Sequence, residues 1–84
     1  MLRIEHIAEE GRTRLRFSGE LRSADLEEAR KEIRKLASQT VLDLSEISLV
    51  DREGVRWLNA CQTVGVKVEC CTPYILEWMH QENL

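Results

Sequence analysis

Residues 41–64 place a strand pattern directly before a helix pattern, and this arrangement limits the possible folds more than any other part of the chain. Residues 41–44 are a short, mostly apolar run that begins with a β-branched valine, as buried strands often do. From Asp51 onward, apolar residues recur at helical spacing, at Val55, Leu58 and Cys61. A buried strand, a loop and then a helix are typical of α/β proteins with parallel strands.

The N-terminal part of the chain predicts an antiparallel hairpin. Residues 2–7 and 13–17 both alternate apolar and polar side chains, and Gly11 lies in the turn between them. Leu15 and Phe17 are expected to face the core. An arginine stripe lies on the opposite side, at Arg12, Arg14 and Arg16. We interpret this stripe as a solvated face, with a partner surface as the alternative.

The next segment predicts a helix between two strands. Gly19 is expected to break the second strand, and Ser23 to cap the helix that follows. Its apolar positions are Leu26, Ala29, Ile33, Leu36 and Ala37. The strand at 41–44 and a loop up to residue 50 come next.

The last third of the chain adds a strand and a helix. Gly65 is placed to end the second helix, and residues 66–71 alternate as a fourth strand. Thr72 and Pro73 form a helix start, with a hydroxyl cap followed by proline. The apolar face of this third helix is expected at Ile75, Trp78 and Met79. The whole chain predicts an α/β fold, a small mixed sheet of four strands with an antiparallel N-terminal edge strand and three helices.

Composition excludes several classes of function. With 84 residues, the chain is expected to be a single domain, 1–84. Its net charge of −3 gives no electrostatic basis for binding nucleic acid. Residues 1–6 contain no apolar signal-peptide core, and no run is long enough to insert into a membrane. Three cysteines, an odd number, suit a reducing compartment, so we expect a cytoplasmic protein.

Candidate catalytic and metal-binding residues are sparse. The glycines form no phosphate-binding loop, and neither His6 nor His80 is placed beside a nucleophile. Asp43, near the end of a parallel strand, is expected to hold backbone amides of the following loop. Adjacent Cys70 and Cys71 point to opposite faces of a strand, which argues against a shared metal site. We expect Cys61 and Cys70 to be small core residues and Cys71 to lie at the end of the strand. We therefore expect no enzyme activity, no cofactor and no metal site.

The start of the second helix is the strongest candidate for a functional site. Asp51 can cap the helix, and Glu53 suits its dipole. Arg52 does not suit the dipole, which indicates that it points to solvent or to a partner. Gly54 is costly within a first turn, so it indicates either close backbone packing or the approach of a partner.

Residues 12–79 resemble a STAS domain, the fold of the anti-sigma factor antagonists. That family shows Gly-Glu-Leu after an apolar strand, as Gly19, Glu20 and Leu21 do here. It then shows a helix, a Leu-Asp-Leu strand, and Asp-Ser-Ser-Gly or Asp-Ser-Thr-Gly at the next helix start. Residues 42–44 match that strand, and Asp51 and Gly54 match the helix start.

The resemblance implies a STAS-like fold and a regulatory, non-enzymatic role in binding a protein partner. The family's phosphorylated serine corresponds to Arg52, and Glu53 replaces the second hydroxyl, so the serine phosphoswitch is not expected. The expected partner is an anti-sigma factor of the kinase-like type, bound through the loop and helix start at residues 47–56. The partner-binding residues expected there are Ser48, Asp51, Arg52, Glu53, Gly54 and Arg56.

Two alternatives remain within the same resemblance. STAS-like proteins also serve as accessory subunits of ABC-type membrane transporters, which would make the partner a transporter ATPase. Some family members bind nucleotides, although no residue here specifies one. The family usually adds a strand and a helix after the third helix, and these are missing before Leu84. An uncovered sheet edge or apolar helix face would then favour a homodimer.

Overall fold

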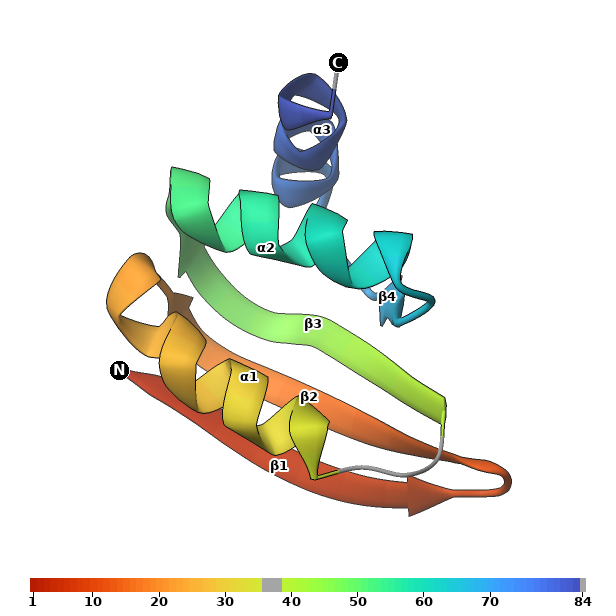
Figure 1. The fold of residues 1–84 in the computed structure, drawn as a ribbon. Coiled ribbons are helices and arrows are strands. Elements are labelled where there is room, and N and C mark those ends of the chain that lie inside the picture. The colour runs from red at the N-terminus through yellow and green to blue at the C-terminus, as the bar shows by residue number, and fades with distance from the viewer. Residues whose placement is uncertain (36–38, 84) are drawn as a thin grey trace.

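The computed structural model describes residues 1–35 and 39–83, which form a mixed four-stranded sheet and three α-helices (Figure 1). The strand order is β1-β2-β3-β4, with β1 antiparallel to β2 and the other pairs parallel. This confirms the predicted α/β class and the antiparallel edge strand. The elements are β1 (Leu2–Glu9), β2 (Arg12–Leu21), the 3-10 turn η1 (Ser23–Asp25), α1 (Leu26–Arg34), β3 (Gln39–Val50), α2 (Arg52–Thr63), β4 (Lys67–Glu69) and α3 (Pro73–Glu82).

The predicted hairpin is confirmed, but the second strand is longer than expected. Gly11 turns the chain with a φ of 76°, and β1 pairs with β2 without interruption. Gly19 does not break β2, so that prediction was wrong. It adopts a φ of 91° next to a shift in the β2–β3 register, and the strand then continues to Leu21. Pairing with β3 on the other side holds this irregular segment in the sheet.

The third strand is also longer than its apolar run. Residues 45–50, expected to be a loop, continue β3 and pair with the end of β2 as far as Leu21 and Val50. Ser45, Glu46, Ser48 and Leu49 are exposed, so this half of the strand lacks the continuous apolar pattern that predicts a buried strand. The prediction of a loop was therefore wrong, because strand pairing rather than local hydrophobicity defines this segment.

The helix ends follow their local signals at α2 and α3 but not at α1. Thr72 accepts a hydrogen bond from the Ile75 amide, and Gly65 follows α2 with a φ of 95°. Ser23 does not cap α1, which begins only at Leu26 after η1. Leu36 and Ala37, expected at the end of this helix, lie outside the described residues.

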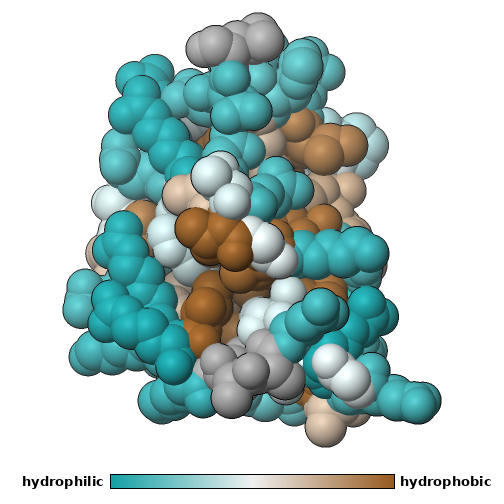
Figure 2. All heavy atoms as spheres, turned by 45° about the vertical axis from the view of Figure 1, so that its right-hand side comes forward, coloured by the Kyte–Doolittle hydropathy of each residue, from teal (hydrophilic) through white to brown (hydrophobic). Residues whose placement is uncertain are grey.

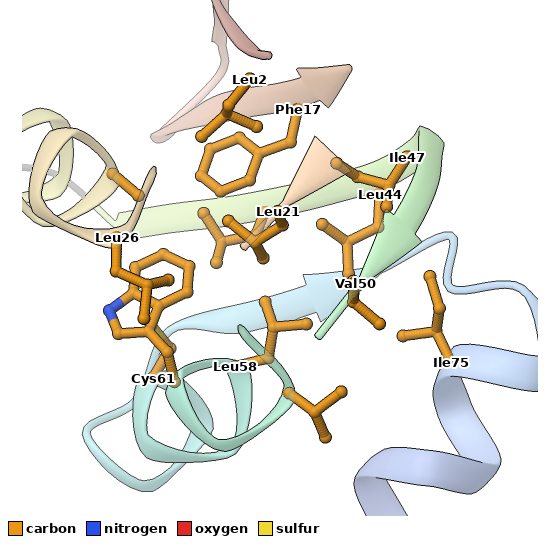
Figure 3. Packing of buried hydrophobic residues seen from close by; sticks show 14 of the residues in the cluster. Leu2, Phe17, Leu21, Leu26, Leu44, Ile47, Val50, Leu58, Cys61 and Ile75 are labelled. Atoms are coloured by element: carbon orange, nitrogen blue, oxygen red, sulfur yellow. The ribbon is translucent and has the colours of Figure 1, made fainter. Parts of the chain in front are cut away.

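The hydrophobic core lies between the sheet and the helices (Figures 1 and 3). Phe17 from β2 stacks on Trp57 from α2, with ring centroids 6.1 Å apart and planes 12° apart. Leu58 of α2 and Ile75 of α3 extend the core toward Val50, at the end of β3. As expected, Ile75 and Met79 bring α3 to the core; Trp78 packs only partly against it.

The arginine stripe is a network of ion pairs on the other face of the sheet. Arg14 contacts Glu9 of β1, Asp43 of β3 and Glu69 of β4, with nitrogen–oxygen distances of 2.7, 3.3 and 3.0 Å. The Arg14 side chain is only 14% exposed, so the expectation of a fully solvated stripe was wrong for this residue. Hydrogen bonds to Glu9 and then to Glu69 raise the pKa of Arg14, which keeps it charged.

The fourth strand is shorter than expected, and its cysteines lie differently. β4 ends at Glu69, and Cys70 adopts a φ of 62°. This left-handed residue interrupts the alternation of the strand, so Cys70 is exposed while Cys71 packs partly against the core. The expectation that Cys70 is a core residue was wrong; Cys61 is buried as expected.

Candidate functional site

Asp51 joins the start of α2 to the end of β2. As the N-cap residue, it accepts a hydrogen bond from the Gly54 amide at 2.8 Å through Oδ1. Its second oxygen, Oδ2, accepts from the Ser23 amide at 2.8 Å, and its own amide donates to the Leu21 carbonyl. The predicted cap is therefore confirmed, and the same side chain also links two segments that are far apart in the sequence.

These bonds also determine the charge state of Asp51. Burial raises the pKa of its carboxyl group, but the hydrogen bonds from the Ser23 and Gly54 amides favour the ionised form more strongly. The net result is a lowered pKa, so Asp51 is ionised at neutral pH. A negative charge at this position also suits the dipole of α2.

Gly54 is required by close packing of the backbone. A Cβ atom added at this position would lie 2.5 Å from the Leu21 carbonyl oxygen and 3.3 Å from Oδ1 of Asp51. Gly54 is buried, so of the two explanations considered from the sequence, close backbone packing is the one that the structure shows. Asp51 and Gly54 thus position the helix start, and neither offers a large exposed surface.

The exposed part of the site consists of charged side chains around the first turns of α2. Arg52, Glu53 and Arg56 are all more than half exposed. Arg56 lies 3.0 Å from Glu82 of α3 and 3.5 Å from Glu53, and Arg52 lies 3.9 Å from Glu82. Exposed ion pairs of this kind contribute little to stability, so these side chains can exchange partners at small cost.

Two further residues at this surface were not named among the expected site residues, although Leu49 lies within the expected segment 47–56. Leu49, in the last part of β3, is 37% exposed although it is a large apolar residue. Glu82 is brought to α2 by the docking of α3, a contact between residues 26 positions apart. The sequence carries no signal for which of the apolar residues among 47–50 is exposed; the pairing of β3 with β2 decides it. We call the set Ser48, Leu49, Arg52, Glu53, Arg56 and Glu82 the helix-start surface.

Ser48 stabilises the strand below this surface. Its hydroxyl donates a hydrogen bond to the Gly19 carbonyl at 2.9 Å, next to the register shift between β2 and β3. Ser48 therefore holds the irregular part of the sheet in addition to being exposed. The helix-start surface is built on backbone that is fixed by Ser48 on one side and by Asp51 on the other.

A second exposed surface is an apolar groove between α1 and α2. Figure 2 shows brown side chains exposed among mostly teal ones on this side of the molecule. The groove is bordered by Arg30 and Arg34 of α1, and Val64 at its edge is 78% exposed. Its apolar lining comes from Ile33, Trp57, Ala60, Cys61, Val64 and Val66.

The titratable groups within the fold serve structural purposes. Asp43 accepts from the Ser45 amide at 2.9 Å, as expected for a carboxylate that holds backbone, and it also pairs with Arg14 and Arg16. Burial raises the pKa of the Cys61 thiol to about 11, which leaves it protonated and unreactive. Among residues 1–35 and 39–83, no three His, Cys, Asp or Glu side chains are grouped as metal ligands.

Comparison of the chain with models of protein families, and with curated proteins, finds no match. Within the described part of the chain, none of the helices combines the length and the apolar character needed to cross a membrane.

Proposed function

We propose that the protein is a non-enzymatic regulatory module that binds another protein through the helix-start surface. The observation that carries this proposal is the contrast within residues 47–56. Asp51 and Gly54 hold the backbone rigidly, while Arg52, Glu53 and Arg56 project from it into solvent. A preorganised backbone reduces the entropy lost on binding, and exposed arginines are frequent in protein interfaces.

The composition of the helix-start surface supports a protein partner. Leu49, at the end of β3, supplies an exposed apolar contact, and the arginines and glutamates of α2 and α3 can form ion pairs with side chains of opposite charge. Such a mixture of one apolar anchor and a charged rim is common at transient interfaces. The resemblance to anti-sigma factor antagonists makes a kinase-like anti-sigma factor the partner that we propose.

The proposed binding does not depend on a phosphoserine at the start of α2. Arg52 and Glu53 carry no hydroxyl group, and the nearby Ser48 hydroxyl is engaged with the Gly19 carbonyl. The module would therefore bind constitutively or be regulated elsewhere. Phosphate found on Ser45 or Ser48 by mass spectrometry, together with loss of binding, would contradict this part of the proposal.

Reversal of the two arginine charges tests the surface directly. The R52E/R56E variant should no longer capture the protein that the wild-type chain captures from cells of its source. The reason is that two glutamates in place of the arginines would repel acidic side chains of the partner. Identification of the captured protein by mass spectrometry tests the partner class. An anti-sigma kinase would support the proposal, whereas a transporter ATPase would support the accessory-subunit alternative.

A variant on α1 provides the matched control. K31E/R34E changes the net charge by the same amount but lies away from the helix-start surface, and Arg34 borders the apolar groove. It should capture the partner as well as wild type does. Loss of capture with K31E/R34E and retention with R52E/R56E would show that the partner binds the α1–α2 groove and would overturn the proposed surface.

A further inference from the structure

The two edges of the sheet differ in how well they are protected. At one edge, β4 has only three residues, Lys67–Glu69, and ends at the left-handed Cys70. A short strand with a lysine cannot easily accept another strand. At the other edge, β1 is an eight-residue strand, and Figure 1 shows none of the helices or strands of the described residues beyond it.

β1 lacks several of the usual features that prevent pairing at an edge, and its charged residues Arg3 and Glu5 are of opposite sign. It contains neither proline nor lysine, and its register with β2 runs without a bulge from Leu2 to Glu9. The backbone groups on its outer side are therefore arranged as a regular, unpaired row. Such an edge is a template for a further strand.

The side chains of β1 limit which strand can be added. Leu2 and Ile4 pack toward the helices, and His6 pairs with Glu32 of α1 at 2.6 Å, so these residues share one face. Arg3 and Glu5 lie on the opposite face, where they and Ser18 line a hollow in the surface. Glu5 is 62% exposed and its recorded ion pair, with Arg16, is 4.0 Å long.

We propose that two copies of this chain associate through antiparallel pairing of their β1 strands, with the two-fold axis at Ile4. A two-fold axis perpendicular to the sheet keeps the helices of both copies on the same face. In this register Arg3 of each copy lies opposite Glu5 of the other, which forms two charge-complementary cross-strand pairs. Ile4 meets its counterpart on the helix face and extends the apolar core across the axis.

The neighbouring registers that preserve the two faces are less favourable. With the axis at Glu5, two glutamates would lie opposite one another, which is destabilising. With the axis at His6, Arg3 would face Glu9, whose carboxylate already accepts from Arg12 and Arg14. Among the described residues Arg3 makes no ion pair, so its pairing with Glu5 competes only with the 4.0 Å contact between Glu5 and Arg16.

Complementary charge reversals test both the edge and the register. In sedimentation velocity, wild type should show a concentration-dependent monomer–dimer equilibrium. R3E alone and E5R alone should each weaken dimerisation by about tenfold or more, because each replaces two attractive pairs with two like-charge pairs. An equimolar mixture of R3E and E5R should restore dimerisation, since the heterodimer again pairs opposite charges at both sites.

Two controls separate pairing at β1 from general charge effects. K31E and E28R, on the exposed side of α1, change the net charge equally and should leave the wild-type equilibrium unchanged. Circular dichroism should show that R3E and E5R remain folded. A wild type that is monomeric up to high micromolar concentration would overturn the proposal. So would a dimer that is unaffected by both variants, or one that mixing R3E with E5R does not restore.

Discussion

At the scale of single residues, Gly54 occupies a position that has no room for a side chain. The Gly54→Ala substitution should destabilise the protein by about 1–3 kcal/mol, the usual cost of inserting a methyl group where there is no room. The reason is the contact of 2.5 Å that the new Cβ would make with the rigid Leu21 carbonyl. Urea unfolding measures this difference.

Glu53→Ala is the matched control for Gly54→Ala in the same turn of α2. Its side chain is 58% exposed, so the free energy of unfolding should change by less than about 0.5 kcal/mol. If Gly54→Ala proved as stable as Glu53→Ala, the backbone of β2 would have to move away from α2 more easily than its hydrogen bonds suggest.

At the scale of elements, α3 is held by a few defined contacts. Ile75 is 2% exposed and packs in the core, while Asn59 of α2 donates to the Met79 carbonyl at 2.9 Å. Ile75→Ala should therefore cost about 2–5 kcal/mol, because it leaves a cavity under the helix. Thermal or urea unfolding would show the loss.

Tyr74 precedes Ile75 and provides the comparison within the same helix. It is 61% exposed, so Tyr74→Ala should have a much smaller effect on unfolding than Ile75→Ala. Similar losses for both substitutions would mean that the contact between Tyr74 and Trp78 contributes more than its exposure suggests. Glu82 reaches Arg56 only while α3 is docked. Ile75→Ala should therefore also weaken the ion pair between Arg56 and Glu82 at the helix-start surface.

At the scale of the whole molecule, ionised carboxylates link stability to pH. The pKa of Glu9 is lowered mainly by its hydrogen bond from Arg14. The pKa values of Asp43 and Asp51 are lowered because hydrogen bonds outweigh the effect of burial. The unfolded chain then binds more protons than the folded chain in acid, so the stability from these groups is fully present above about pH 5 and falls as the pH drops further.

The variant Asp51→Asn tests this dependence. Asparagine can still accept from Gly54, but it carries no charge and its amide group cannot accept from the Ser23 amide. Urea unfolding between neutral pH and about pH 2 should show a lower plateau for Asp51→Asn and a shallower loss of stability in acid. An equally steep loss would show that Asp51 does not contribute to the acid sensitivity.

Much of the fold and part of the site follow from local patterns. The caps at Asp51 and Thr72, the turn at Gly11 and the end of α2 at Gly65 depend on residues a few positions apart, so the sequence alone predicts them. The length of β3 and the continuation of β2 through Gly19 could not be predicted, because they depend on pairing between distant strands. The same limit applies to Leu49, whose exposure depends on that pairing.

The sequence by itself therefore determined the α/β class, the order of the elements and the helix start that presents Arg52 and Glu53. Only the tertiary structure decided which acidic side chain each arginine meets and how deeply that pair is buried. Arg14 is held by Glu69, 55 residues away, whereas Arg56 meets Glu82 at the surface. The physical reason is range: hydrophobic period and capping act within a few residues, while ion pairing and close backbone contact need segments that folding has brought together.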